Sequence, residues 1–231
     1  LLGEDNKTVT LRAVPVGTYA TQVCLHDTGW VIDPRPWAQG SIVVMDVTTG
    51  AVRALVGGYE DRLEGLVRAT QTRRQPGSSF KPYVYAAALS AGYSQMSPIV
   101  DGPLSLRGSN GKPWSPKNHD DRYLGPINLR TALRLSRNPP SVRLALALGP
   151  ERIASVARVL GIRSPMRADL TLALGSSEVN LLEHVNGIAT IARYGVRLEP
   201  GLWRRVEDVD GAAVVPGGAE AATFAEGAGV A

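Results

Sequence analysis

Cysteine and histidine are scarce in this sequence of 231 residues, which contains one cysteine and three histidines. The single cysteine, Cys24, excludes an internal disulfide and leaves the redox compartment undecided. His26, His119 and His184 are far apart from one another in the sequence, so no metal-ligand spacing is present. We therefore expect no metal site.

Lysine is also scarce, and arginine supplies nearly all of the positive charge. The net charge is +4, and the arginines are scattered along the chain without a dense basic run. This pattern is typical of solvated surfaces and argues against a nucleic-acid partner. The four lysines are Lys7, Lys81, Lys112 and Lys117.

Long hydrophobic runs are absent, because no apolar stretch approaches the roughly 18 residues that a membrane span needs. The chain begins at Leu1 with neither an initiator methionine nor a signal-like segment. We expect that the natural N-terminus is missing here, and that any membrane anchor is missing with it.

The composition predicts a folded protein, since 44% of the residues are hydrophobic and only 20% are charged. The length allows one large domain, or one domain with a smaller appendage. Residues 8–14 alternate polar and apolar side chains, and residues 34–36 read as a stiff connector. We therefore interpret residues 1–39 as the tail of a small β-rich domain with its linker, and residues 40–231 as the main domain.

The main domain combines strands and helices. Residues 41–47 and 51–56 are β-branched runs around a short loop that ends in Gly50, which predicts a hairpin. Residues 93–128 are rich in glycine, proline, serine and asparagine, and predict a long ordered loop. A last hairpin is expected around Asp210-Gly211. Helices are expected at 78–91, 129–136, 141–148, 150–160 and 179–193.

Two expectations concern how these helices end and pack. The helix from Leu129 has to stop near Asn138, because a residue before a proline is disfavoured in the α region. In the helix 179–193, one apolar stripe is expected to face the core. Its members are Leu182, Val185, Ala189 and Ala192.

A serine three residues before a lysine occurs twice, at Ser78/Lys81 and at Ser109/Lys112. Nucleophilic catalysis needs the hydroxyl and the amine on the same side, and positions i and i+3 of a helix satisfy that requirement. Ser109 lies in a loop rich in glycine and asparagine, so we interpret that match as chance. Ser78 opens a predicted helix directly after Pro76-Gly77.

The start of a helix suits a serine nucleophile. Unsatisfied N–H groups and the positive end of the helix dipole favour an oxyanion there, and the Ser78 N–H is a candidate donor. Burial or nearby positive charge would lower the pKa of Lys81 enough for it to accept a proton. The alternative is that Ser78 is only a helix N-cap and Lys81 a surface lysine.

Ser136-Arg137-Asn138 is the only Ser-x-Asn in the chain, and the proline rule places it at a break between two helices. A hydroxyl and an amide on such a corner can relay a proton and hold a substrate amide. The alternative is an ordinary junction between a helix and a loop. Ser-x-x-Lys followed by Ser-x-Asn is a combination found in penicillin-binding proteins and related β-lactamases.

Several longer segments resemble the transpeptidase domain of class A, bifunctional penicillin-binding proteins, in the order expected for that family. The resemblance extends from about Gly40 to about Val215. The segments that carry it are Arg68–Pro82 with its Arg-Arg-Gln-Pro-Gly-Ser-Ser-Phe-Lys-Pro run, residues 111–118 followed by Arg122–Pro126, Ser136–Leu144 and Leu174–Glu183.

This resemblance implies roles for four residues. Ser78 would be the acylated nucleophile and Lys81 its proton acceptor; Ser136 would assist proton transfer. Asn138 would hold the amide of the peptide or β-lactam. The implied reaction is D,D-transpeptidation, in which the serine attacks the D-Ala-D-Ala bond of a stem peptide, releases D-Ala and passes the acyl group to a neighbouring amine.

The resemblance also implies partners and a location. The partners would be peptidoglycan stem peptides and glycan strands, with β-lactams as inhibitors that trap the serine. No metal or organic cofactor is implied. The parent protein would be anchored in the bacterial inner membrane, through a segment absent here, with this domain on the periplasmic side.

The sequence departs from the family pattern in three places. Val67 stands where the family usually has asparagine, and Arg137 is bulkier than the expected middle residue of Ser-x-Asn. The third family motif, Lys-Thr-Gly on a sheet strand, is missing, because none of the four lysines is followed by Thr-Gly. A fragment that ends before this strand is the simplest interpretation.

We therefore expect an α+β fold (α/β in the broad sense), the penicillin-binding, serine β-lactamase-like transpeptidase fold, with helices on both sides of an antiparallel sheet that is incomplete here. One alternative function is a non-catalytic relative that binds penicillin or stem peptide without turnover. Another is a β-lactam hydrolase, for which no glutamate loop for deacylation is found.

Overall fold

The structure is a computed structural model of the whole chain. The predicted strand at 8–14 and Ser109 lie outside the residues that it describes. The described residues are 22–26, 29–33, 39–58, 65–107, 111–202, 206–211 and 213–215.

The predicted hairpin of the main domain is present. β3 (Ile42–Met45) pairs antiparallel with β4 (Val52–Val56), with Ile42 opposite Val56. The turn is stabilised by Asp46, whose carboxylate accepts from the N–H groups of Thr48 and Thr49, each at 3.0 Å. Gly50 ends this turn with a φ of 72°, a conformation that favours glycine.

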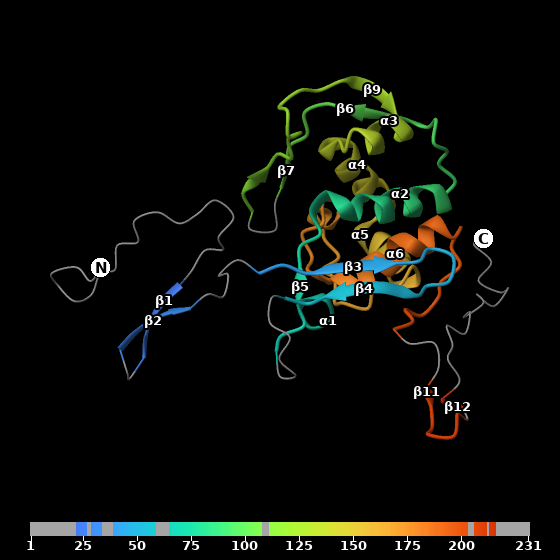
Figure 1. The fold of residues 1–231 in the computed structure, drawn as a ribbon. Helices are drawn as coiled ribbons and strands as arrows, with labels where there is room; N and C mark the ends of the chain where they lie inside the picture. The colour runs from blue at the N-terminus through green and yellow to red at the C-terminus, as the bar shows by residue number, and fades with distance from the viewer. Residues whose placement is uncertain are drawn as a thin grey trace.

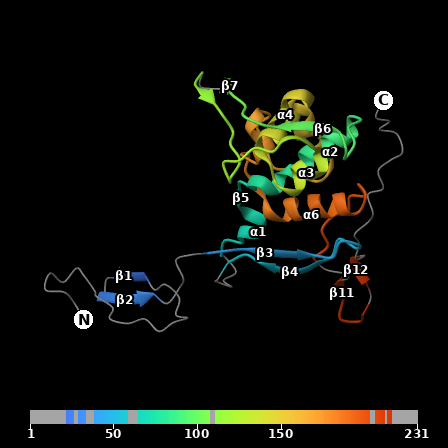
Figure 2. The ribbon, with the colours of Figure 1, turned by 90° about the horizontal axis from the view of Figure 1, so that it is seen from above.

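The helical body lies beside this hairpin (Figure 1). It contains α1 (Arg68–Gln71), α2 (Lys81–Ser90), α3 (Leu129–Arg134), α4 (Asn138–Leu148), α5 (Pro150–Val159) and α6 (Leu181–Ala192), with the 3₁₀ turns η1 (Gly77–Phe80) and η2 (Leu170–Leu174). α2 packs against α4 and α5, and α6 packs against β3. Figure 2 shows α6 between the β3–β4 hairpin and the helices α2, α3 and α4.

α2 is at the centre of the hydrophobic core. Phe80, Tyr83 and Val84 have no exposed surface, and they are surrounded by buried side chains of the other helices. Pro82 lies in the first turn of α2, where the missing N–H breaks no helical hydrogen bond. The residues that begin α2 are therefore held by the core.

The hairpin is covered by helices on one face only, among the described residues. Val43, Met45 and Leu55 are partly buried on the face toward α6. On the other face, the β-branched side chains of Ile42, Val44 and Val56 are 60%, 48% and 49% exposed. The expectation of helices on both faces of the sheet is not met by the described part of the chain.

Five further strand pairs are short. β1 (Gln22–His26) pairs with β2 (Gly29–Asp33), β5 (Arg73–Arg74) with β10 (Val179–Asn180), β6 (Pro98–Asp101) with β9 (Gly125–Asn128), β7 (Leu106–Arg107) with β8 (Pro113–Trp114), and β11 (Val206–Glu207) with β12 (Ala213–Val215). The last pair is the hairpin expected around Asp210-Gly211. The strands β6 to β9 correct the expectation that 93–128 is only a loop. That segment folds back on itself, so its two ends pair as β6 and β9 across a long separation in sequence.

The helix boundaries differ from the sequence-based expectation at two places. The break after α3 falls at residues 135–137, and Asn138 is already the first residue of α4. Arg137 takes the extended N-cap conformation, and Pro139 and Pro140 lie in the first turn of α4, where proline is tolerated. Ser78 lies in η1 and precedes α2, whereas the sequence predicted a continuous helix from Ser78.

The predicted apolar stripe of α6 is partly wrong. Ala189 is buried as expected, but Ala192 is exposed, and the buried face includes the polar Asn186 and Thr190. These two are satisfied by hydrogen bonds: the Asn186 amide donates to Leu198 O at 2.9 Å, and the Thr190 hydroxyl donates to Asn186 O at 2.8 Å. Because these bonds offset the cost of desolvation, apolar periodicity alone misses the polar part of the buried face.

Candidate active site

Ser78 and Lys81 are joined by one 3₁₀ turn. The Lys81 N–H donates to Ser78 O, so the two residues are separated by one turn of η1. In a 3₁₀ turn, side chains at positions i and i+3 are eclipsed. Both side chains therefore leave the same side of the chain, which is the geometry that the spacing of this motif requires.

The Ser78 hydroxyl is exposed and is not a helix cap. No side-chain cap bond is formed at the start of η1 or of α2. The N–H groups of its neighbours are bonded, Gly77 to Gly175 O and Ser79 to Pro76 O. Within the described part of the chain, neither the hydroxyl nor the N–H of Ser78 has a hydrogen-bond partner. Both groups are therefore available to a ligand.

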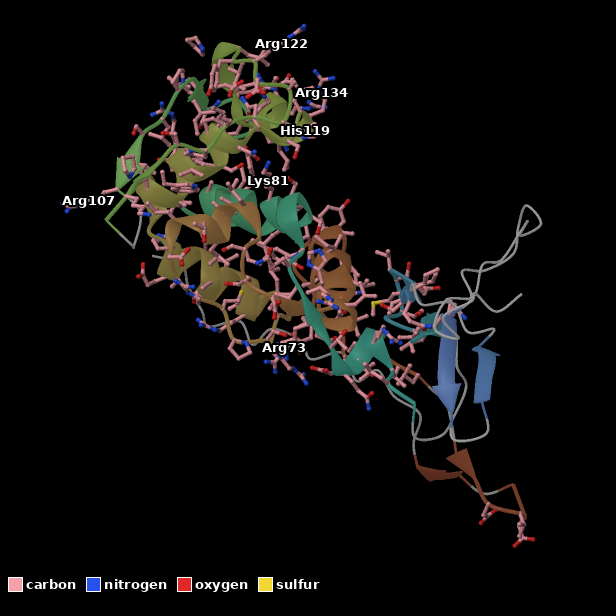
Figure 3. The ribbon with its side chains drawn as sticks, turned by 90° about the vertical axis from the view of Figure 1, so that its left-hand side faces the viewer. Arg73, Lys81, Arg107, His119, Arg122 and Arg134 are labelled. Atoms are coloured by element: carbon pink, nitrogen blue, oxygen red, sulfur yellow. The ribbon has the colours of Figure 1, made fainter. Side chains whose placement is uncertain are left out.

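Lys81 is buried, with 1% of its surface exposed. Its ammonium donates to Ser136 O at 2.6 Å, to Ser136 Oγ at 3.1 Å and to Asn138 Oδ1 at 2.7 Å. Figure 3 shows Lys81 on the side of α2 toward the segment that carries His119 and Arg122. The structure thus brings Lys81, Ser136 and Asn138 together across more than 50 residues of sequence.

No direct side-chain hydrogen bond joins Ser78 and Lys81 in the described structure. An ammonium has three hydrogens, and the three acceptors from Ser136 and Asn138 use all of them. This arrangement fits the charged lysine; in the neutral amine, the Ser136 hydroxyl can instead donate to the nitrogen. A bond from the Ser78 hydroxyl requires a neutral amine with a free lone pair.

The pKa of Lys81 is lowered to about 8, first by burial and second by the positive charge of Arg137. Burial acts because a charged amine loses water that the surrounding acceptors only partly replace. With this pKa, roughly one molecule in ten has a neutral Lys81 at pH 7. That fraction makes the lysine a usable proton acceptor near neutral pH.

Ser136 has an unusual backbone conformation at the corner between α3 and α4. Its φ is 54°, in the left-handed region that residues other than glycine rarely enter. The corner is fixed by the Arg137 N–H, which donates to Ala132 O at 2.9 Å. This conformation directs both the carbonyl and the hydroxyl of Ser136 at the ammonium of Lys81.

Asn138 is fixed by three bonds. Its N–H donates to Asn118 Oδ1 at 2.8 Å, its Nδ2 donates to Lys117 O at 2.6 Å, and its Oδ1 accepts from Lys81. A side-chain amide has two hydrogens and two lone pairs on oxygen. One hydrogen and one lone pair of Asn138 therefore remain for a substrate amide.

Arg137 carries a buried ion network that the sequence did not reveal. Its guanidinium donates to Asp101 at 2.7 Å and to both oxygens of Asp120, at 3.0 and 2.9 Å. It also donates to Arg122 O. Asp101 is completely buried and accepts from Asn118 at 2.8 Å. The network ties the Ser136–Asn138 corner to two distant segments.

This network accounts for the bulky residue in the middle of Ser-x-Asn. Burial alone lowers the pKa of Arg137, but its hydrogen bonds to the carboxylates of Asp101 and Asp120 outweigh burial, and the net shift is upward. Arg137 therefore stays charged inside the protein, where its charge disfavours a second charge on Lys81. Asp120 has no motif around it in the sequence; only its partner Arg137, 17 residues later, makes it part of the site.

Two further properties concern only the described residues. No group of three or more histidine, cysteine, aspartate or glutamate side chains in these ranges is arranged to hold a metal ion. None of the described helices has both the length and the apolar character of a membrane span.

Residues 40–223 match the family described as penicillin binding protein transpeptidase domain. The chain belongs to this family, as its motifs predicted. It is 42% identical to penicillin-binding protein 1A of Neisseria gonorrhoeae over 185 residues, which are 79% of this chain and 23% of that protein. The same protein of Rickettsia conorii is 38% identical over 184 residues. The chain thus spans about a quarter of the length of the curated relatives that it matches.

Solved structures show the same fold. Penicillin-binding protein 1A from Haemophilus influenzae superposes with a TM-score of 0.73 and 33% identity, over 84% of this chain and 29% of that one. The PonA1 protein from Mycobacterium tuberculosis in complex with penicillin V gives a TM-score of 0.68 and 26% identity, over 78% of this chain and 51% of that one. The predicted transpeptidase fold is therefore confirmed.

Proposed function

We propose that this chain provides the acylation site of a D,D-transpeptidase that cross-links peptidoglycan stem peptides. The observation that carries the proposal is Lys81, a buried lysine with a pKa of about 8 that lies one 3₁₀ turn from the exposed Ser78 hydroxyl. A protein that only binds a ligand needs no such lysine. The site therefore gives the non-catalytic alternative no support.

The proposed acylation follows from these positions. Ser78 Oγ attacks the carbonyl carbon of the D-Ala-D-Ala bond while its proton passes toward Lys81. The C–N bond then breaks, the leaving amine of D-Ala takes up the proton, and an ester links the peptide to Ser78. The amine of a second stem peptide attacks this ester, loses a proton and releases the Ser78 hydroxyl.

Ser136 is the natural relay for the first proton. Of the three groups around the Lys81 nitrogen, the Ser136 carbonyl and Asn138 Oδ1 only accept hydrogen bonds, whereas the Ser136 hydroxyl can also donate. A neutral Lys81 therefore takes a hydrogen bond from this hydroxyl. Asn138 would hold the substrate amide with its remaining hydrogen and lone pair. The Ser78 N–H would support the oxyanion.

The partners follow from the same chemistry. The substrates would be stem peptides that end in D-Ala-D-Ala, carried on glycan strands, and β-lactams would acylate Ser78 as substrate mimics. The solved complex of the related PonA1 with penicillin V supports the β-lactam part of this proposal. The site of action would be the bacterial cell envelope, on the periplasmic side of the inner membrane.

The test uses a labelled penicillin and the full-length gene product. We expect a covalent adduct on Ser78, none in Ser78→Ala, and acylation slowed by orders of magnitude in Lys81→Ala, because an unactivated serine is a poor nucleophile. Ser109→Ala, in the second Ser-x-x-Lys, is the matched control and should label normally. An adduct on Ser109, or no adduct on the wild type, would refute the proposal.

A further inference from the structure

The turn that carries Ser78 also contacts α6. Ser79 Oγ lies 2.9 Å from Nε2 of His184, which belongs to α6. The other ring nitrogen, Nδ1, lies 3.2 Å from the hydroxyl of Tyr83 on α2. His184 therefore joins α6 to the residue next to Ser78 and to the first turn of α2. The transpeptidase motifs assign no catalytic or binding role to any of these three residues.

The hydrogen bonds show where one proton of the imidazole lies. The Ser79 hydroxyl donates to Pro76 O at 2.7 Å, so its proton is already used. Nε2 must then be the donor in the bond between His184 and Ser79. The Tyr83 hydroxyl lies 3.2 Å from Nδ1 but also donates to His184 O at 3.1 Å, so its single hydrogen does not fix the state of Nδ1. The bonds therefore place a hydrogen on Nε2, and the charges around the ring decide whether Nδ1 carries a second one.

α6 approaches Tyr83 of α2 closely at the position where His184 contacts it. Gly187 follows His184 by three residues on α6, and a Cβ at that position would overlap the Tyr83 hydroxyl. Glycine within a helix costs about 1 kcal/mol relative to alanine, so its presence here is informative. The Tyr83 ring also contacts the rings of Phe80 and His184, with centroids 4.9 and 5.7 Å apart.

Both neighbours of Ser78 are consequently anchored. Gly77 is bonded through its N–H to Gly175 O, and Ser79 is bonded through its hydroxyl to His184. Ser78 lies between them with no partner of its own in the described structure. A serine without side-chain bonds is kept in position only if its neighbours are fixed.

We propose that His184 is a positioning residue for Ser78, acting through Ser79 in its neutral, Nε2-protonated form. The proposal rests on the proposed function, because it assumes that Ser78 is the residue acylated. Its role is to keep the η1 turn in the orientation in which the Ser78 hydroxyl meets both the substrate carbonyl and the proton acceptor. Misplacing a nucleophile by about 1 Å can reduce a rate by around a hundredfold.

The charges around His184 favour its neutral form. A pocket of ≈ 270 Å³ beside the turn is lined by Ser79, His184 and two cations, Arg68 of α1 and Arg74 of β5. The lining of this pocket contains no carboxylate. On the other side of the ring, the ionisable neighbour is the phenol of Tyr83. A protonated ring would add a third positive charge, and burial also lowers the pKa of His184.

The experiment measures penicillin acylation in the full-length gene product, with the non-covalent binding constant and the acylation rate determined separately. We expect His184→Leu and Ser79→Ala each to lower the acylation rate about tenfold to a hundredfold without changing non-covalent binding. The double variant should lose no more than the worse single variant, because both changes break the same contact. His184→Gln, whose Nε2 can still donate to Ser79, should keep most of the rate.

The pH profile separates positioning from a general loosening of the site. In a positioning role, His184→Leu lowers the plateau of the profile and leaves its midpoint, which belongs to Lys81, unchanged. Ile188→Ala, an exposed change one turn later on α6, is the control and should behave as wild type. Any of three results would overturn the proposal: a wild-type rate in His184→Leu, a loss that parallels a fall in melting temperature, or failure of His184→Gln to rescue.

A readout without acylation keeps this proposal separate from the proposed function. Nitrogen NMR of the wild type should show His184 as the Nε2–H tautomer, and amide exchange at residues 77–80 should accelerate in His184→Leu. If the wild type forms no penicillin adduct, the proposed function fails while these two measurements still decide whether His184 holds the turn. A protonated or Nδ1–H ring, or unchanged exchange, would overturn the proposal by itself.

Discussion

In the proposed mechanism, Lys81 has to act as a base for acylation. As an ammonium it donates to all three acceptors from Ser136 and Asn138, whereas proton uptake from Ser78 needs the neutral amine. The lowered pKa connects the two states, because the cost of losing the proton at pH 7 is small when the pKa is about 8. Proton loss from Lys81 is therefore a step that pH can control.

This leads to an expected pH dependence of penicillin acylation. Since only neutral Lys81 accepts the proton, the rate should rise about tenfold per pH unit below 8 and level off above it. Stopped-flow acylation between pH 6 and 10 measures the profile. Lys81→Arg, which cannot lose its proton in this range, should give a low, flat profile. A midpoint near 10, the ordinary value for lysine, would contradict the structure.

The residue scale also shows what sequence could and could not predict. The spacing and the proline rule placed Ser136 and Asn138 on a corner, and the structure brings that corner to Lys81. Their catalytic roles stay predictions. The burial of Arg137 could not be foreseen, because its counter-charge Asp101 is 36 residues earlier in the chain. The contact of His184 with Ser79 spans 105 residues and carries no local signal.

At the scale of elements, η1 is fixed by contacts on both sides. One of them is a close approach of two glycines, since Gly77 N donates to Gly175 O at the end of η2. A Cβ at Gly175 would overlap the backbone of Gly77, and no side-chain movement can relieve that overlap. The helices and the β3–β4 hairpin were predictable from periodicity and turns, but an approach between two turns 98 residues apart was not.

We therefore expect Gly175→Ala to damage both stability and acylation. Gly175 has a φ of 72°, so alanine costs roughly 1–2 kcal/mol from the backbone alone. Gly195 follows α6, has a φ of 93° and has no atom within 4 Å of its Cβ position. It is therefore the matched control for the backbone cost of alanine at positive φ. Urea unfolding should show a larger loss for Gly175→Ala than for Gly195→Ala, and only the former should slow acylation. Equal losses would mean that the contact with Gly77 does not restrain the turn.

At the scale of the whole molecule, one face of the β3–β4 hairpin stands out, because no helix among the described residues covers it. Ile42, Val44 and Val56 lie side by side on it and are about half exposed. A two-stranded sheet is marginally stable in water and leaves strand edges open to pairing. Apolar exposure of this kind promotes association when it is contiguous.

We expect the isolated 231-residue chain to associate through this face and to react with penicillin slowly. Replacing Ile42, Val44 and Val56 together by threonine keeps β-branched strand residues and removes the apolar surface. Analytical ultracentrifugation should then show monomers of the triple variant at concentrations where the unsubstituted 231-residue chain associates. Val159→Thr with Val196→Thr, two exposed valines elsewhere, is the control and should not reduce association. The expectation would be contradicted if the unsubstituted 231-residue chain is monomeric, melts cooperatively and reacts rapidly with labelled penicillin.

The ion network of Arg137 also has a consequence for how reactivity arises during folding. Ser78 and Lys81 are neighbours in sequence, but Lys81 becomes buried, and its pKa falls, only after residues 101, 118–122 and 136–138 have come together. Contacts between such distant segments form slowly, because a long loop has to close first. In a partly folded chain, the lysine keeps the ordinary pKa of about 10.4 and the serine stays inert. If Ser78 is the residue acylated, as we propose, reaction with a β-lactam would be acquired only when folding is complete, and unfolded copies of the protein would escape the antibiotic.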